Sequence, residues 1–288
     1  MERGGRKVAK KAFPTATVET VRKMIPLDDT LFQKMCEDKG VCQEIISTIL
    51  GQEVKVLQVI PQDSIGNLQG RAVRLDCLCR LKGGILVNIE VQKRNDDDHE
   101  ARVRYNASVI TSNKTPKSTK FKDIQKVVVI FISAFDMYGK GFPIYHVDRV
   151  VRETGDVVKN GFTEIYVNTV AKKYDNELNA NVSDLMDLFV DRDTFNTEKF
   201  PEFSKRKNTF VNTQKGERIM CQAVQDLIDE TRKEGKLTDL FEYVEQGLMT
   251  DANASKAAKL TKEKFKEEMA LRGYTVPQRK NSKAAAAS

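Results

Sequence analysis

The sequence has few of the residues that build histidine and cysteine sites. Its 288 residues include two histidines, His99 and His146, so neither a Ser-His-Asp triad nor a histidine-based metal site is expected. The cysteines number five, which is odd, and none forms a Cys-x-x-Cys pair. Sparse cysteines of this kind indicate a reducing compartment. Their spacing predicts buried or free thiols rather than a zinc site.

Long apolar segments are also missing. The longest apolar run, Val127 to Ile132, has the length of a strand, whereas a membrane helix needs about 20 apolar residues. The basic N-terminal residues are not followed by the apolar segment of a secretory signal. We therefore expect a cytoplasmic protein that does not enter a membrane.

The net charge of +7 is unevenly distributed. Residues 1–12 carry +4 and residues 272–288 carry +4, which leaves 7 − 8 = −1 for residues 13–271. The overall basicity is therefore weak evidence for a core that binds nucleic acid. A local cluster is better evidence, because residues 101–126 carry seven basic side chains against Asp123 alone. Both a surface for a polyanion and a solvated helix face with its loop fit this cluster.

Two strand-like segments are the most informative part of the chain. Residues 71–81 and 85–92 alternate apolar and polar side chains with a period of two, which predicts half-buried strands. Lys82, Gly83 and Gly84 join them as a short hairpin loop. Because the apolar faces must match across the hairpin, Cys77 is expected opposite Ile89.

This register places Asp76 opposite Glu90. Opposed residues have Cβ atoms about 4.5–5.5 Å apart, so the two carboxylates repel each other unless a cation lies between them. Hard cations such as Mg²⁺ prefer carboxylate oxygens, and the hairpin could supply half of a metal site. An ordinary polar sheet face with unrelated acids is the alternative.

The remaining pattern predicts an α/β fold. A helix over residues 27–50, which Gly40 could divide into two, is followed by three strands, a helix over 99–112 and a strand over 127–132. Strands over 143–151 and 163–170 come next. After Tyr174 the chain is expected to be mainly helical, with candidate helices over 182–190, 216–234, 238–247 and 251–272, the last of which could turn near Leu260. We expect a flexible basic arm over 1–20, a core over 21–175, a helical region over 176–273 and a disordered tail over 274–288. A helix-turn-helix within 251–272 is possible, but simple helix packing explains the same pattern.

These residues together resemble a known family. The segments that carry the resemblance are Leu27-Asp-Asp-Thr-Leu-Phe, Arg74-Leu-Asp-Cys, Asn88-Ile-Glu-Val-Gln and Arg104-Tyr. In order and spacing they are similar to the motifs of the PD-(D/E)XK nuclease family transposases, the recombination-promoting nuclease group. The resemblance covers residues 24–250 and implies a restriction-endonuclease-like core with the order αβββαβ, a mixed sheet flanked by helices.

The resemblance also implies roles for single residues. Asp76 and Glu90, with the Val91 carbonyl, would bind Mg²⁺ or Mn²⁺. Gln92 takes the position of the usual lysine and would position a water, although it supplies no positive charge. Arg102, Arg104, Lys114 and Lys117 would contact the DNA backbone. Two accessory candidates each have a structural alternative. Glu44 would be an acid from the first helix, or a surface residue, and Tyr105 would be a site hydroxyl, or a core residue.

The function expected from the sequence is metal-dependent hydrolysis of DNA with low sequence specificity, in recombination or a mobile element. The alternative is a catalytically silent nuclease-fold module that binds nucleic acid or a protein partner. A third hypothesis makes the C-terminal helices a platform for a partner or for a homo-oligomer.

Overall fold

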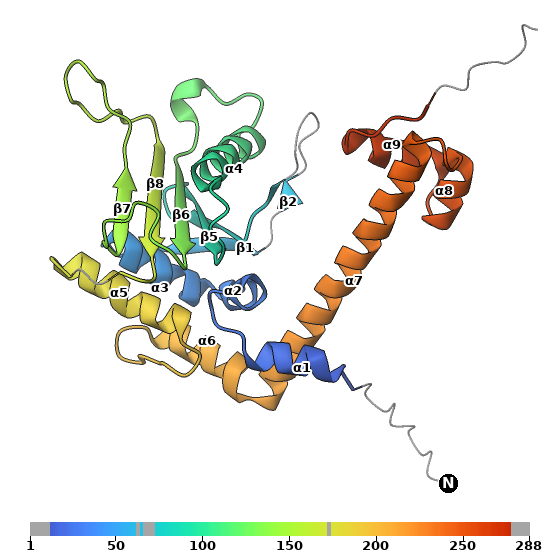
Figure 1. Ribbon diagram of the computed structural model, residues 1–288. Helices are drawn as coiled ribbons and strands as arrows, with labels where there is room; N and C mark the ends of the chain where they lie inside the picture. The colour runs from blue at the N-terminus through green and yellow to red at the C-terminus, as the bar shows by residue number, and fades with distance from the viewer. Residues whose placement is uncertain (1–11, 62–63, 66–72, 172–173, 278–288) are drawn as a thin grey trace, which may run out of the picture. The chain divides into compact units, whose positions relative to one another are not determined.

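The computed structural model describes residues 12–61, 64–65, 73–171 and 174–277. The chain divides into two compact units, the first holding the described residues up to Val224 and the second those from Gln225. Figure 1 shows the elements along the chain. The helices are α1 (Thr15–Arg22), α2 (Asp29–Cys36), α3 (Lys39–Leu50), α4 (His99–Lys114), η1 (Phe121–Asp123), α5 (Glu177–Val190), α6 (Pro201–Asn212), α7 (Gln214–Glu245), α8 (Asp251–Ala257) and α9 (Lys262–Leu271).

A mixed sheet forms the centre of the first unit. Its strands are β1 (Val56–Pro61), β4 (Cys77–Leu81), β5 (Leu86–Gln92), β6 (Val127–Ser133), β7 (Ile144–Val147) and β8 (Phe162–Asn168), in the order β1-β4-β5-β6-β8-β7. The pairs β5–β6 and β6–β8 are parallel and the other pairs are antiparallel. The short strands β2 (Ser64–Ile65) and β3 (Val73–Arg74) pair separately. The order α, β1, β4, β5, α4, β6 confirms the predicted αβββαβ core.

Helices cover both faces of this sheet. One face packs against α2, α3, α5 and α6 in a core that includes Phe32, Ile45, Val87, Phe189 and Phe203. The other face packs against α4 through Val103, Ala107 and Ile110. Figure 1 shows α4 on one side of the strands and α2, α3 and α5 on the other. The strands β5 and β6 are almost continuously buried, as expected for a sheet covered on both faces.

The predicted hairpin register is confirmed. Cys77 pairs with Ile89 and Cys79 with Val87, and the Leu81 N–H donates to the Ile85 carbonyl at 2.9 Å. Gly83 and Gly84 both have positive φ, 96° and 83°, a conformation in which other residues are strained. The tight loop therefore fixes which residues of the two strands are opposite each other.

Several boundaries differ from the sequence prediction. The helix predicted over 27–50 is divided at Asp38, whose carboxylate accepts from the Gly40 N–H at 2.8 Å and starts α3. Residues of the expected flexible arm from Thr15 onward form α1, while residues 1–11 lie outside the described part. The helix α6 was not predicted. The two helices predicted over 216–247 are one helix, α7.

The predicted helical C-terminal region is divided between the two units. The helices α5 and α6 contribute to the core of the first unit, although the sequence places them outside it. The second unit has a small core of its own, made by Phe241, Val244, Ala254, Phe265 and Met269. The predicted turn near Leu260 separates α8 from α9. Of the expected tail, residues 278–288 lie outside the described part.

Candidate active site

Asp76 lies at a break in the first hairpin strand. The strand predicted over 71–81 is interrupted between β3 and β4, and Asp76 occupies the bend. Its carboxylate accepts two hydrogen bonds, from the backbone N–H of Val91 at 3.1 Å and from Nε2 of Gln33 at 3.2 Å. The first comes from β5 and the second from α2. Three elements therefore fix the orientation of this carboxylate.

Glu90 converges on the same place from β5. The Cys77–Ile89 pair makes it the neighbour of Asp76 across the hairpin, and it is buried, at 6% exposure. Asn88 Nδ2 donates to its carboxylate at 2.7 Å. The side chain of Asn88 is buried, and its Oδ1 has no hydrogen-bond partner among the described residues. Around Glu90, the carboxylate oxygens and the Asn88 Oδ1 acceptor therefore outnumber the hydrogen-bond donors among the described residues.

Both carboxyl groups have raised pKa values. Burial, and then the charge of Asp29, raises the pKa of Asp76 to about 6, against the hydrogen bonds from Val91 and Gln33. Burial, and then the charge of Asp76, raises the pKa of Glu90 to about 8. Desolvation and a neighbouring like charge both disfavour the ionised form. The pair is therefore short of positive charge.

A third carboxylate, Asp29, was missed as a site residue. Asp29 lies in the first turn of α2, and burial raises its pKa. Asp29 and Gln33 are four residues apart, which places them on one face of the helix. The signal that the sequence offers for it is the Leu27-Asp-Asp-Thr segment, which contains Asp29.

Glu44, the candidate accessory acid, contacts the start of α6. Its two carboxylate oxygens accept from the backbone N–H groups of Glu202 and Phe203, each at 2.8 Å. These are the free N–H groups at the start of α6, where a carboxylate is favoured. Glu44 therefore anchors α6, and Asp29 is the helical acid beside Asp76.

Gln92 lies at the end of β5, and its hydrogen-bond partner among the described residues is acidic. Its Nε2 donates to Asp96 at 3.2 Å. Lys93 follows but points elsewhere, because its Nζ pairs with Asp28 at 2.5 Å. This agrees with the alternation along the strand, which places Lys93 on the face opposite Gln92. No lysine replaces the missing cation at this position among the described contacts.

The predicted DNA contacts separate into two groups. Arg102, in α4, is close enough to the site that its charge lowers the pKa of Asp76, Glu90 and Asp29. Arg104 and Lys117 are exposed and Lys114 is partly buried. Of the four predicted DNA contacts, Arg102 is therefore the one whose charge acts on all three carboxylates.

Tyr105 packs against the core on the α4 side of the sheet. Tyr105 therefore has the core-packing position that was one of the two alternatives for it.

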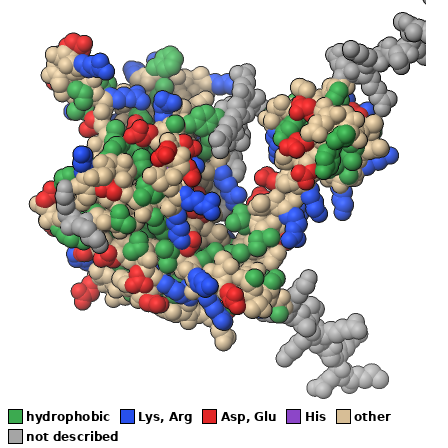
Figure 2. Space-filling model, in the orientation of Figure 1, with side chains coloured by type: hydrophobic (Ala, Val, Ile, Leu, Met, Phe, Trp, Pro, Cys, Tyr) green, Lys and Arg blue, Asp and Glu red, His purple; other side chains and the backbone are tan. Residues whose placement is uncertain are grey.

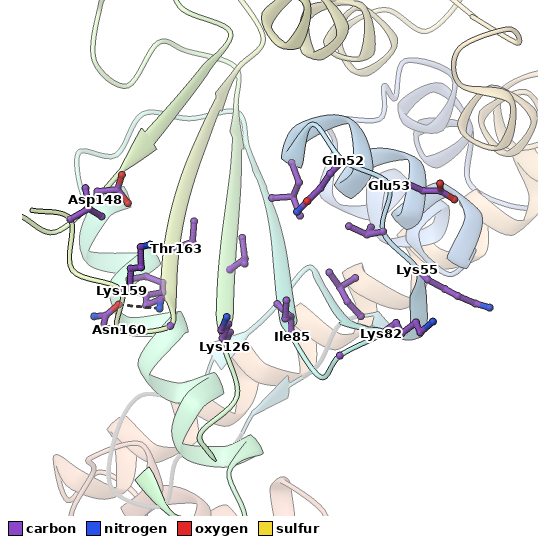
Figure 3. A pocket seen from close by; sticks show the side chains of 18 of the residues that line it. Gln52, Glu53, Lys55, Lys82, Ile85, Lys126, Asp148, Lys159, Asn160 and Thr163 are labelled. Atoms are coloured by element: carbon purple, nitrogen blue, oxygen red, sulfur yellow. Dashed lines mark hydrogen bonds between the residues drawn. The ribbon is translucent and has the colours of Figure 1, made fainter. Parts of the chain in front are cut away.

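A separate pocket lies at the other end of the parallel strands (Figure 3). Its volume is about 1340 Å³, and Ile85, Lys126 and Thr163 lie where β5, β6 and β8 begin. Asp76, Glu90 and Gln92 are not among its lining residues. The carboxylates are instead at the ends of β4 and β5 that face away from the loop at Gly83.

A mixed sheet between helices, with two acids converging from adjacent strands, defines a nuclease-like protein with a restriction-endonuclease-like core. The family comparison agrees with this class. Residues 28–247 match the profile of the PD-(D/E)XK nuclease family transposases, and the chain belongs to this family. No curated protein and no solved structure matches the chain.

Family membership supports a nuclease-like role in recombination or in a mobile element. Within the part of the chain that the structure describes, every helix is too short or too polar to cross a membrane.

Proposed function

We propose that this protein is a divalent-metal-dependent endonuclease that hydrolyses DNA phosphodiester bonds with low sequence specificity. The observation that carries the proposal is the convergence of Asp76 and Glu90 in a buried position with too little positive charge. A buried acidic pair of this kind is stabilised by a cation. Perturbed carboxyl groups gathered from adjacent elements are also typical of functional sites.

The residues present fit Mg²⁺ or Mn²⁺. Hard divalent cations bind carboxylate and carbonyl oxygens, and Asp76 and Glu90 supply the carboxylates. The Val91 N–H donates to Asp76. In a strand, the N–H and C=O of one residue point to the same side, so the Val91 carbonyl is the third candidate ligand. When bound, a divalent cation lowers the pKa of water and stabilises charge on the phosphate.

The remaining site residues position these groups and the substrate. The Val91 N–H and Gln33 hold the Asp76 carboxylate in place. Arg102 supplies positive charge beside the acids, where a phosphate oxygen would need it. Gln92 can orient a water through its amide. Arg104, Lys114 and Lys117 extend the basic surface along α4 and beyond, and such backbone contacts provide affinity without sequence information.

A silent DNA-binding module is the second candidate, and Gln92 favours it. Nuclease sites with a lysine at this position have a cation that contributes to the transition state, whereas here the side chain is an amide engaged with Asp96. The two functions predict the same DNA binding but different outcomes with Mg²⁺.

The test is a plasmid assay with the full chain. Supercoiled DNA is incubated with wild type, Asp76→Asn and Glu90→Gln in Mg²⁺, in Mn²⁺ and in a chelator. We expect nicking that requires metal and falls at least about 100-fold in each variant, because each removes a charged ligand. Glu53→Gln is the matched control, since it makes the same chemical change at an exposed residue outside the site.

Equal cleavage by wild type and both variants would disprove the assignment of the site. DNA binding without cleavage in every metal would establish the silent module instead.

A further inference from the structure

Four of the five cysteines gather in the core of the first unit. Cys36 ends α2, Cys42 lies near the start of α3, and Cys77 and Cys79 share one face of β4. All four side chains are fully buried and none forms a disulfide. The fifth, Cys221, lies in α7. Residues that are up to 43 positions apart in the sequence therefore converge, which no Cys-x-x-Cys pattern would have indicated.

Three of the sulfur atoms, those of Cys36, Cys42 and Cys77, form a group compact enough for one metal ion, and the fourth, that of Cys79, adjoins this group through Cys77. Cys42 Sγ is 3.7 Å from Cys77 Sγ, and Cys77 Sγ is 3.7 Å from Cys79 Sγ. The sulfurs of Cys36, Cys42 and Cys77 all lie within 4.8 Å of one another. A Zn–S bond of about 2.3 Å in a tetrahedron requires sulfurs about 3.8 Å apart. The closest sulfur pairs already match this spacing.

The surroundings favour a soft, closed site. Only sulfur ligands are offered, and thiolates select Zn²⁺ over Mg²⁺ or Ca²⁺. Cys42 lies in the first turns of α3, whose N-terminal end carries partial positive charge. This charge offsets part of the cost of burying thiolates. Full burial leaves no position open to a substrate, which is typical of structural rather than catalytic zinc.

We propose that Cys36, Cys42, Cys77 and Cys79 bind one structural Zn²⁺ ion. Each coordinating thiol releases its proton to solvent when the ion binds. The ion joins α2, α3 and β4 directly behind the carboxylate site, because Cys77 follows Asp76 and α2 also carries Gln33. It is a separate site from the proposed Mg²⁺ site, with different ligands and a different role.

The experiment measures zinc in the full chain, purified from zinc-supplemented medium and passed through a desalting column. We expect about one zinc per chain by elemental analysis. We also expect a thiol reagent to release zinc, and Co²⁺ loading to give thiolate-to-cobalt charge-transfer absorption. Cys42→Ser and Cys77→Ser should lose most of the metal. Cys221→Ser is the matched control, and it should keep the metal.

The zinc content of the wild-type protein tests the proposal even if a cysteine variant fails to fold. Folded wild type without zinc, and without a cobalt–thiolate band after loading, would overturn the proposal. So would zinc retained equally by folded Cys42→Ser and Cys77→Ser.

The Asp76→Asn, Glu90→Gln double variant separates this proposal from the proposed function. It should keep its zinc while it loses metal-dependent cleavage, so either proposal can fail without the other.

Discussion

At the scale of single residues, ionisation of the buried carboxyl groups of Asp76 and Glu90 destabilises the folded protein when no metal ion is bound. The pKa of Asp76 is raised from 3.8 to about 6 and that of Glu90 from 4.5 to about 8. The folded chain therefore holds more protons than the unfolded chain between about pH 4 and pH 8. Stability must fall as pH rises through this window.

This shift predicts how pH affects unfolding. In a chelator, the melting temperature of wild type should decrease from pH 5 to pH 8, and Glu90→Gln should flatten the decrease because its amide does not ionise. Added Mg²⁺ should stabilise wild type increasingly as pH rises, since binding competes with protons. Thermal unfolding at several pH values measures both. A difference between wild type and Glu90→Gln that is independent of pH would contradict the raised pKa.

Glu44 leads to a second prediction at this scale. Its carboxylate accepts from two N–H groups at the start of α6. Glu44→Ala should therefore lower the unfolding free energy by about 1–2 kcal/mol, the usual cost of losing a helix cap. Denaturant unfolding measures this effect. Cleavage per folded molecule should not change. A large loss of activity with unchanged stability would instead show that Glu44 acts in the active site.

At the scale of elements, the start of α7 approaches α6 closely. A Cβ built on Gly216 would lie 1.9 Å from the Thr209 carbonyl oxygen and 2.6 Å from the Phe210 Cα. Both neighbours are backbone atoms, so the clash cannot be relieved by a rotamer change. The connection between α6 and α7 thus depends on the absence of a side chain at this position.

Two alanine substitutions within α7 test this contact. Gly216→Ala should destabilise the protein by about 2 kcal/mol or more, within the range for overpacking. Gly235→Ala is the matched control, because nothing lies within 4 Å of a Cβ there. It should stabilise by up to about 1 kcal/mol through helix propensity. Chemical denaturation gives both values. Equal effects of the two substitutions would show that the helices separate readily.

The sequence predicts the elements with strong periodicity. Alternation along β4 and β5, with glycines between them, is sufficient for the hairpin register and so for the opposition of Asp76 and Glu90. The helix α6 lacks a clear periodic pattern of apolar residues. Its segment is strongly polar and holds few apolar side chains, among them Phe203 and Phe210.

Long-range contacts account for what was missed at the site. The bond from Gln33 to Asp76 joins residues 43 positions apart. It depends on how α2 packs against the sheet, and no local pattern encodes that. The same reason explains why the cysteine spacing did not reveal the sulfur cluster.

At the scale of the whole molecule, the net positive charge is carried by the terminal segments. Residues 1–11 carry five basic and one acidic side chain, and residues 278–288 carry three basic ones, so these segments account for 4 + 3 = 7 of the net charge of +7. Acidic and basic side chains are interspersed on the face of the molecule that Figure 2 shows.

Removing both terminal segments should therefore weaken DNA binding at low salt and make it less dependent on salt, because fewer counterions are released. Cleavage at saturating DNA should remain. Titrations at several salt concentrations measure the slope. A chain that lacks only the uncharged residues 284–288 is the control. An unchanged slope would show that α4 and the following loop provide the contacts.

The bond from the Val91 N–H to Asp76 affects how inactive variants should be chosen. The main chain of β5 continues beyond the paired end of β4, and the Asp76 side chain occupies the donor that a strand would otherwise pair with. Alanine at this position would remove an acidic ligand and also leave an amide unsatisfied, so lost catalysis and local fraying would be confounded. Asparagine removes the charge but retains an acceptor oxygen for the Val91 N–H, so Asp76→Asn is the suitable variant for an experiment that tests for bound DNA.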